Sequence, residues 1–263
     1  TKTNNIGYLS FKAHGKFEIP NSLYVRKERG HCYVSFCYEQ GQPDRKLSTN
    51  EEHLAFLQGA TREYLEEHTM GVDRGVAIPV CAGEQTYDFT HSQKKNMSKA
   101  DRYIKRLQRK LARQQKGSNR RAKTKHRIAV HHAKKANIRN DFAHKTSRLL
   151  VDSSAKIIVF EALRTARMTR RPKAKQDEQG RFISNKAKQK AGLNKSILNV
   201  GWHVIETYTY YKAYSSSKAV FKIPAPTTSQ ECAKCGHTHP DNRKTQALFV
   251  CGNCGNTDNA DHN

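Results

Sequence analysis

Four cysteines near the end of the chain have the spacing of a metal site. Cys232 and Cys235 form one C-x-x-C pair, and after fifteen intervening residues Cys251 and Cys254 form a second. Each pair folds into a tight knuckle that directs two thiolates at one ion, and two such pairs complete a tetrahedral shell around Zn²⁺. A shell of four thiolates leaves no open position for a substrate water, so the zinc is predicted to be structural.

The remaining cysteines and the nearby histidines are weaker candidates for ligands. His237 and His239 follow the first pair, but a histidine beside a cysteine knuckle usually faces solvent. Cys32, Cys37 and Cys81 lie among apolar neighbours, and we expect them to be small buried side chains. Clustered cysteines in a reducing compartment favour a metal over disulfides, so the predicted ligands are the cysteines of the two pairs.

Three carboxylates stand where they can hold a second kind of metal. Asp73 lies in the segment GVDRG, Glu161 ends the apolar run IIVFE, and Asp261 follows the second cysteine pair. Singly, each has a simpler interpretation as a turn residue or a solvent-facing acid. Together they fit a metal site better, because a metal can offset the desolvation cost of an acid at the end of a buried strand. Two or three carboxylates on Mg²⁺ are what two-metal phosphodiester cleavage needs: one ion activates water and the other stabilises the leaving oxygen.

The elements that must position these acids form an α/β pattern after residue 70. Apolar segments over 71–82, 86–89, 156–160 and 218–223 predict strands, and a helix is predicted over 193–214. The segment 156–160 (KIIVF) is almost continuously apolar, as in a strand buried on both faces. Strands that alternate with helices predict an α/β domain.

The chain before residue 70 has a different pattern. Short segments rich in Tyr, Val, Phe and Ile, separated by turn residues, predict the strands of a small antiparallel barrel. A helix is expected from about residue 50 to residue 67, where apolar residues recur on one side. The predicted strands cover residues 6–11, 16–19, 23–25 and 31–38.

Residues 94–148 carry a dense positive charge. They contain 20 Lys or Arg and two acidic residues, with apolar residues at helical spacing, which predicts two long basic helices joined near 117–119. Such a run is usually a solvated surface, but this excess favours binding to phosphate backbones without sequence readout. Residues 164–190 are also polar and basic, and we expect a mobile loop there. The candidate nucleic-acid contacts are Lys99, Arg102, Lys105, Arg106, Arg109, Lys110, Arg113, Arg120, Arg121, Arg127 and Arg139.

The net charge sets the class of partner. With 48 Lys and Arg against 23 Asp and Glu, the 263-residue chain has a formal net charge of +25. Self-repulsion of that size opposes compaction unless a polyanion neutralises the charge. DNA or RNA is therefore the expected partner, and an acidic membrane surface is the weaker alternative. The sequence has neither an apolar run near the ~20 residues of a membrane span nor a signal peptide, so an intracellular location without membrane attachment is expected. The chain begins without Met and stops two residues after Asp261, and we expect it to be a fragment of a longer protein.

The segments around these residues resemble a known family. They are, in order, GVDRG (71–75), IIVFEAL (157–163), PTTSQECAKCG (226–236), FVCGNCG (249–255) and NADHN (259–263). This order is similar to the RuvC-like nuclease of TnpB proteins, the OrfB-type proteins of insertion sequences and relatives of the type V CRISPR effector nucleases. The resemblance covers nearly the whole chain, although the usual N-terminal recognition helices of the family are absent. Its most specific part is a zinc ribbon preceded by T-S-x-x-C and followed at once by N-A-D-x-N.

The resemblance implies a fold and an order of domains. The fold would be an α/β, RNase H-like (RuvC) nuclease domain with an inserted Cys₄ zinc ribbon. Residues 1–45 would be part of an antiparallel wedge β-barrel, residues 46–70 a linker helix, and residues 71–263 the nuclease domain. The nuclease domain would contain the basic helices (94–152) and the ribbon (227–258), which is inserted before the third acidic motif.

The resemblance also implies a function and roles for the acids. Asp73, Glu161 and Asp261 would be the catalytic residues and the ligands of two Mg²⁺ ions, with Asp73 bridging both. The protein would be an RNA-guided, Mg²⁺-dependent DNA endonuclease encoded by a transposable element. Its partners would be a guide RNA derived from the element and target double-stranded DNA, in the cytoplasm of a prokaryote near the nucleoid.

Three other functions stay open from the sequence. A nuclease-dead, RNA-guided DNA-binding repressor ranks lower, because such proteins lose acids that this chain retains. A transposase that acts on element ends without a guide would use the same acids. The simplest alternative is a zinc-ribbon protein that binds nucleic acid and has no activity.

Overall fold

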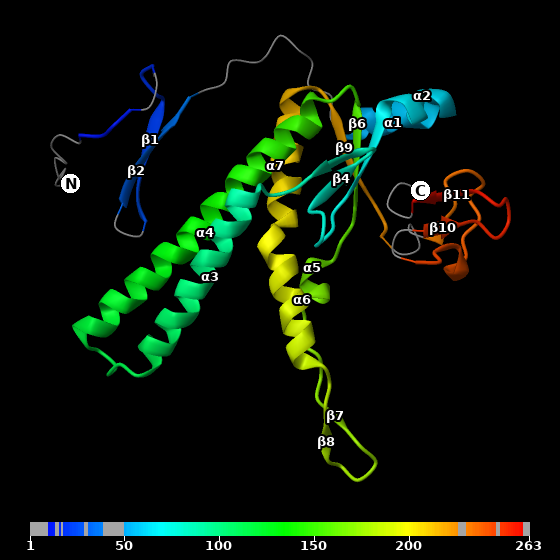
Figure 1. The fold of residues 1–263 in the computed structure, drawn as a ribbon. Helices are drawn as coiled ribbons and strands as arrows, with labels where there is room; N and C mark the ends of the chain where they lie inside the picture. The colour runs from blue at the N-terminus through cyan, green and yellow to red at the C-terminus, as the bar shows by residue number, and fades with distance from the viewer. Residues whose placement is uncertain are drawn as a thin grey trace. The chain divides into compact units, whose positions relative to one another are not determined.

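The computed structural model describes residues 10–13, 16, 18–28, 31–38, 50–225, 230–245 and 248–259. The described residues divide into two compact units. The first takes residues from 1–46 and 103–132, and the second takes residues from 47–102 and 133–263. Figure 1 shows the elements coloured in chain order.

An antiparallel hairpin belongs to the first unit. β1 (Ser22–Glu28) pairs along its whole length with β2 (His31–Cys37). The strand expected at 16–19 is not formed, because residues 16, 18 and 19 have no regular structure. Most of the strand expected at 6–11 lies outside the described residues. The hairpin is therefore the part of the expected barrel that the described residues contain.

The cysteines of this hairpin are less buried than expected. Cys32 is exposed and Cys37 is half-buried. The expectation of burial is wrong for Cys32, because a two-stranded hairpin offers few neighbouring side chains to cover either face. Cys81, in the second unit, is buried as predicted.

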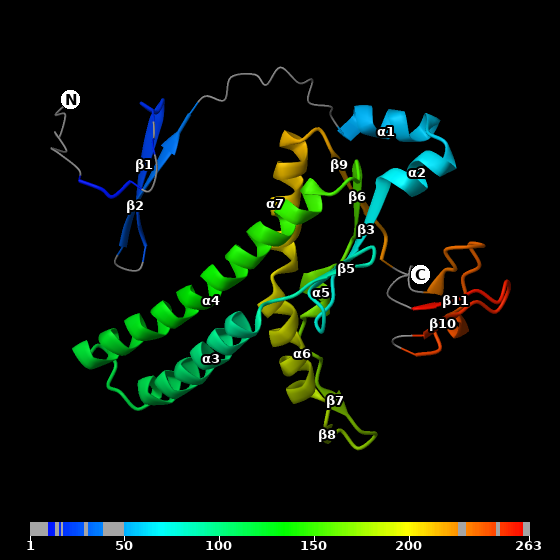
Figure 2. The same ribbon diagram turned by 45° about the horizontal axis from the view of Figure 1, so that its top comes forward.

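A mixed five-stranded sheet forms the centre of the second unit. Its spatial order is β5-β4-β3-β6-β9, in which β3, β6 and β9 are parallel and β4 and β5 continue antiparallel at one edge. Figure 2 labels β5, β3, β6 and β9 of this sheet. The α/β prediction is confirmed, and the apolar β6 lies between two parallel neighbours as its composition indicated. The strands are β3 (Thr69–Asp73), β4 (Val80–Ala82), β5 (Gln85–Tyr87), β6 (Ile157–Glu161) and β9 (Ala219–Ile223).

Two short helices precede the sheet in place of the single helix expected over 50–67. They are α1 (Asn50–Gly59) and α2 (Arg62–His68). Thr61 between them is extended, and its hydroxyl accepts a hydrogen bond of 3.3 Å from the N–H of Tyr64. Threonine in this capping position begins a new helix, which explains the break that the apolar periodicity did not reveal.

The two long basic helices are confirmed. They are α3 (His91–Ala112) and α4 (Asn119–Asp152). The loop between them contains Gly117, whose φ of +83° lies in the left-handed region that glycine adopts without steric cost. None of the helices in the described residues has both the length and the apolar composition needed to cross a bilayer.

Residues 164–190 contain more regular structure than expected. A short helix, α5 (Thr165–Met168), is followed by a hairpin of β7 (Lys175–Gln176) and β8 (Phe182–Ile183). Asp177 orders the turn, since its Oδ1 accepts hydrogen bonds from the N–H groups of Gln179 (3.0 Å) and Arg181 (2.8 Å). Some of the polar residues that indicated a loop therefore belong to one tight turn.

The helix expected over 193–214 is in fact two helices. α6 (Ala187–Val200) and α7 (Trp202–Ser215) are separated by Gly201, whose φ of +79° ends the first helix. With α4, these helices pack on the sheet and bury the main apolar core of the unit. Core side chains include Val72, Phe142, Leu150, Val151, Ile158, Phe160, Ile197, Val200, Trp202, Ile205 and Val220.

Candidate metal centres and nucleic-acid interface

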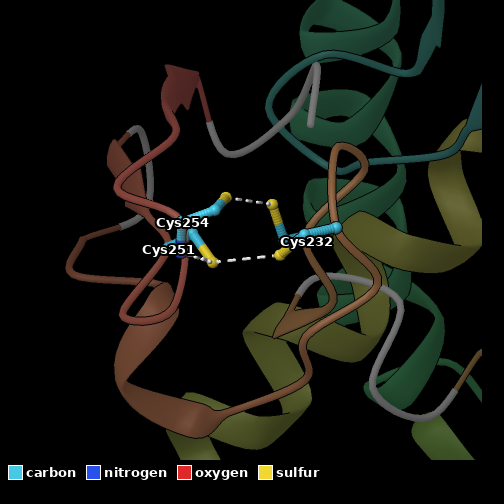
Figure 3. Close-up of side chains that lie close together, drawn as sticks. Cys232, Cys251 and Cys254 are labelled. Atoms are coloured by element: carbon cyan, nitrogen blue, oxygen red, sulfur yellow. Dashed lines mark hydrogen bonds between the residues drawn. The ribbon is translucent and has the colours of Figure 1, made fainter.

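The four cysteines of the two C-x-x-C pairs converge in the structure (Figure 3). Their Sγ atoms all lie within 4.8 Å of one another. Cys232 and Cys254 are 3.6 Å apart, as are Cys235 and Cys251, far longer than a disulfide bond of about 2.05 Å. Sulfurs about 2.3 Å from a tetrahedral zinc ion lie about 3.8 Å from one another. The four thiols therefore fit Zn²⁺ as the sequence predicted.

The backbone around the second pair favours a thiolate. The N–H groups of Cys254 and Asn253 donate to the Cys251 sulfur at 3.5 and 3.4 Å. These bonds, led by that of Cys254, lower the pKa of the Cys251 thiol to about 6, although burial opposes the shift. The N–H of Asn256 favours a thiolate at Cys254 too, but the neighbouring sulfurs, Cys235 first, raise its pKa to about 12. Several thiolates can share this space only when a cation offsets their repulsion.

The histidines beside the first pair lie outside the cysteine cluster. Their rings stack on each other, with centroids 6.2 Å apart, and Nδ1 of His239 accepts a hydrogen bond of 3.2 Å from the N–H of Asp241. Within the described part of the chain, only the four cysteines bring three or more metal-ligating side chains together. His239 is exposed as expected, whereas His237 is half-buried.

Asn242 joins the two halves of the ribbon. Its buried side chain donates from Nδ2 to the main-chain oxygens of Gln230 (2.9 Å) and His237 (3.0 Å), on either side of the first pair. Its Oδ1 accepts a hydrogen bond of 3.0 Å from the N–H of Gly252, within the second pair. One amide thus holds both knuckles, a role that the sequence gave no reason to assign.

We expect Asn242→Ala to release zinc faster than the unmutated chain. The substitution removes three hydrogen bonds, and each buried group left unpaired costs about 1–3 kcal/mol. The measurement is zinc transfer to a colorimetric chelator at neutral pH. Lys244→Ala, which truncates an exposed side chain two residues after Asn242, is the matched control. Equal release rates for Asn242→Ala and the control would contradict this role.

The ribbon has little apolar core of its own. β10 (Leu248–Val250) pairs antiparallel with β11 (Thr257–Asn259), and Phe249 is fully buried with Cys232 and Cys251.

Asp261, the third predicted acid, lies outside the described residues.

Asp73 and Glu161 end two adjacent parallel strands. Val72 pairs with Phe160 in the register of β3 and β6, so the two acids occupy the next positions at the carboxyl edge. Val72 and Phe160 are buried on one face of the sheet. Because side chains alternate along a strand, both acids lie on the other face, on strands about 4.8 Å apart. Two carboxylates in this arrangement fit a hard cation such as Mg²⁺.

Arg74, which the sequence did not single out, is a buried cation beside these acids. Its side chain is 2% exposed, and Nη1 donates a hydrogen bond of 2.8 Å to Oε2 of Glu206. Nη2 donates to the main-chain oxygen of Glu161, and the guanidinium lies 5.0 Å from the centroid of the Phe160 ring. The N–H of Arg74 donates to Oδ1 of Asp73 at 2.6 Å. Arg74 therefore contacts both strands that carry the acids.

Two residues one turn apart on α7 hold the same segment. Nε1 of Trp202 donates to the main-chain oxygen of Gly75 at 3.0 Å, where an added Cβ would lie 2.6 Å from another carbonyl oxygen. Glu206 binds Arg74 and also pairs with Lys222 of β9. Burial alone would raise the pKa of Glu206, but the hydrogen bonds from Lys222 and Arg74 outweigh it and lower the pKa. The carboxylate is therefore ionised at neutral pH.

The helix α3 exposes a basic stripe opposite its apolar stripe. Ala100, Ile104 and Leu107 are buried, and the basic residues recur at the same three-and-four spacing two positions later along the chain. Nine of the eleven candidate nucleic-acid contacts are exposed. They are Lys99, Arg102, Lys105, Arg106, Arg109, Lys110, Arg113, Arg120 and Arg127.

The other two candidates are half-buried. Arg121 is half-buried, and its Nη1 donates to the main-chain oxygens of Leu111 and Gln114 at the end of α3. Arg139 is also half-buried, and burial lowers its pKa. Because both side chains are half-buried, our proposal for phosphate contacts rests on the exposed nine.

A partly buried ion-pair cluster joins α3, α4 and α6. Nζ of Lys135 donates to Oδ1 of Asp101 (2.6 Å) and to Oδ1 of Asn199 (3.0 Å). Nζ of Lys195 lies 2.8 Å from Oδ2 of Asp101. Burial alone would raise the pKa of Asp101, but the hydrogen bonds from Lys135 and Lys195 lower it below its ordinary value.

This cluster predicts a pH-dependent contribution to stability. Because the pKa of Asp101 is lower in the folded state, its contribution is complete above the unfolded pKa of about 3.9 and is lost as the pH falls through the folded pKa. Asp101→Asn is expected to lower the free energy of unfolding by about 1–3 kcal/mol at pH 7, since it leaves the Lys135 ammonium without a charged partner. The difference from the unmutated chain should shrink below about pH 4.

The measurement is urea unfolding across this pH range. Comparing the two proteins at each pH cancels the acid release of zinc, which is common to both. Asp141→Asn, which breaks an exposed pair with Lys145, is the matched control and should change the free energy by less than about 0.5 kcal/mol. An Asp101→Asn difference that stays constant into acid would contradict the prediction.

Two family models match the chain. Residues 35–171, just over half of the 263 residues, match the OrfB_IS605 family, described as a probable transposase. Residues 202–263 match the Cas12f1-like TNB domain. The first match contains Asp73 and Glu161, and the second contains the four cysteines and Asp261.

Curated proteins and solved structures give similar matches. The RNA-guided DNA endonuclease InsQ of Escherichia coli K12 is 36% identical over 195 residues, which are 74% of this chain and 46% of InsQ. The CRISPR-associated endodeoxyribonuclease Cas12f1 of Sulfoacidibacillus thermotolerans is 30% identical over 261 residues, 95% of this chain and 52% of Cas12f1.

Two solved structures also match. One is a Cas12f1–sgRNA–target DNA complex (17% identity, TM-score 0.44, 74% of this chain and 46% of that chain). The other is a CRISPR-Cas12f ternary complex (16% identity, TM-score 0.45, 92% of this chain and 43% of that chain). The chain spans about half the length of the curated relatives that it matches. On the match over residues 35–171, the protein belongs to the OrfB_IS605 family of insertion-sequence proteins.

Proposed function

We propose that this protein is an RNA-guided, Mg²⁺-dependent DNA endonuclease encoded by a transposable element. The observation that carries the proposal is the placement of Asp73 and Glu161 on one face at the carboxyl edge of adjacent parallel strands. Carboxylates that end adjacent strands on one face are the type of ligand that Mg²⁺ takes. The names of the relatives InsQ and Cas12f1 support DNA cleavage as the reaction.

The proposed fold is RNase H-like (RuvC), with residues 71–263 as the nuclease domain and the Cys₄ ribbon inserted within it. The mixed sheet and the converging cysteines support this assignment. Residues 1–45 are proposed to contribute to a wedge barrel, and residues 46–70 to link it to the nuclease domain.

In the proposed mechanism, three acids hold two Mg²⁺ ions. Asp73, Glu161 and Asp261 would be the side chains that hold the ions. When bound there, the ions would supply a water of lowered pKa and Lewis-acid stabilisation of the leaving oxygen. The exposed lysines and arginines of α3 and α4 hold the sugar–phosphate backbone by charge, and base pairing with the guide RNA selects the sequence.

The test begins with the RNA that the protein carries. The chain is purified with RNA acquired during expression, the RNA is sequenced, and the complex is incubated with a matching plasmid and Mg²⁺. The proposal expects cleavage that depends on the match and disappears in Glu161→Gln. Glu84→Gln, which changes an exposed residue in the β4–β5 turn, is the matched control and should cleave normally.

Each other outcome selects a different function. Tight, guide-dependent binding without cleavage would replace the proposal with an RNA-guided repressor. Cleavage or joining of element ends that ignores the RNA would favour a transposase, in line with the description of the family. Binding without dependence on a guide or a metal would leave a zinc-ribbon nucleic-acid-binding protein.

A further inference from the structure

We infer that Arg74 is a positioning residue that sets the spacing of the two described acids, and that Glu206 and Trp202 of α7 hold it in place. The inference rests on the proposed function of Asp73 and Glu161 as metal ligands. Arg74 acts through these acids and is not proposed to touch the metal or the DNA.

Arg74 links the ends of the two strands that carry the acids. Its N–H donates to the carboxylate of Asp73, and its Nη2 donates to the main-chain oxygen of Glu161. The first bond restricts the rotation of one acid, and the second fixes the strand end from which the other projects. The first bond uses the main chain of Arg74, whereas the second uses its side chain, so the guanidinium is what ties the strand end that carries Glu161 to the turn after Asp73.

The orientation of Arg74 is in turn fixed by α7. Glu206 accepts from Nη1 at 2.8 Å, and Trp202, one helical turn earlier, donates to the oxygen of Gly75 at 3.0 Å. Lys222 of β9 holds the other carboxylate oxygen of Glu206. The turn after Asp73 is thus bound at two points by one helix, and that helix is tied to the far parallel strand of the sheet.

The burial of this cluster is poorly explained by stability alone. Buried ion pairs are often no more stabilising than apolar side chains of similar volume, because both charges lose their hydration. Arg74 has a further cost, since its Nε is buried without a hydrogen-bond partner among the described residues. Its planar guanidinium does one thing that an apolar side chain cannot: it binds two acceptors in fixed directions. Those acceptors are Glu206 and the end of the strand that carries Glu161.

The test measures metal binding rather than cleavage. Mn²⁺ alone, a paramagnetic substitute for Mg²⁺, is titrated into the full zinc-bound chain without nucleic acid and followed by electron paramagnetic resonance. The site is defined as the Mn²⁺ that Asp73→Ala removes. Arg74→Lys keeps the charge but cannot bridge both acceptors, and is expected to weaken this Mn²⁺ about 10–100-fold. Arg62→Lys, at an exposed pair with Glu66, is the matched control and should bind as the unmutated chain does.

A second variant separates positioning from folding. The double substitution Arg74→Met with Glu206→Leu replaces the pair by apolar side chains and is expected to match the unmutated chain in urea unfolding while losing the same Mn²⁺ affinity. Either folded variant binding Mn²⁺ as tightly as the unmutated chain would overturn the inference but leave the proposed function intact. Failure of both variants to fold would also overturn it, since Arg74 would then be needed for the fold itself. If Asp73→Ala removes no Mn²⁺ at all, the proposed metal site fails, and the inference fails with it.

Discussion

A Cys251→Ser chain is expected to lose its zinc and, with it, the fold of the described ribbon residues, 230–245 and 248–259. Phe249 and two cysteines are the buried apolar side chains of this segment, which is too little to support a fold without a metal. Structural zinc in modules of this size contributes about 10–16 kcal/mol of apparent binding free energy, which is also folding free energy. The measurements are zinc content per chain and the protease sensitivity of the ribbon, with one zinc and a resistant ribbon expected for the unmutated protein.

Cys32→Ser is the matched control, because that cysteine is exposed and far from the ribbon in sequence. It should retain one zinc per chain. A Cys251→Ser protein that holds a full equivalent of zinc would show that the four thiols do not share one ion. Because Asp261 lies seven residues after Cys254, loss of the ribbon is also expected to abolish the proposed cleavage. Full nuclease activity in Cys251→Ser would disprove that coupling.

Phe160→Ala is expected to lower the free energy of unfolding by about 3–5 kcal/mol. Phe160 is fully buried in β6, between β3 and β9, and its ring lies under the Arg74 guanidinium. The substitution loses apolar burial and leaves a cavity that the two flanking strands cannot close. Since domains of this kind are stable by about 5–15 kcal/mol, a large part of the total would be lost.

Urea unfolding of the zinc-bound chain measures this effect. Phe182→Ala in β8 makes the same chemical change at a side chain that is 76% exposed, and should shift the free energy by less than about 0.5 kcal/mol. Similar losses for the two variants would mean that Phe160 is not part of a close-packed core.

The zinc site could be predicted from the sequence because its information is local. Two short knuckles carry all four ligands, and the glycine that follows each pair, Gly236 or Gly255, adopts the positive φ of a tight turn. The strand character of β6 was equally local, since a short apolar run needs no partner to be recognised. The approach of Asp73 and Glu161 was different. It depends on the pairing of strands 88 residues apart, and the family resemblance, rather than the spacing, indicated it.

The sequence did not reveal features that depend on tertiary contacts. Arg74 and Glu206 are 132 residues apart, and nothing in either neighbourhood marks a buried ion pair. The breaks at Thr61 and Gly201 were missed because apolar periodicity continues across both positions, while a cap or one left-handed residue is enough to end a helix. Arg121 was grouped with the phosphate contacts because the sequence shows only its place in a basic run. Its bonds to the end of α3 form because α4 returns beside α3, which the sequence did not reveal.

During synthesis, β6 emerges from the ribosome well before β9, its second neighbour in the sheet. In that interval the apolar strand has β3 on one side and an open row of backbone groups on the other. An open edge of this kind recruits strands from other chains. A messenger RNA that ends between the codons of α6 and those of β9 should therefore yield a protein that aggregates. A chain that includes residues 219–223 covers the open edge of β6 with its own β9.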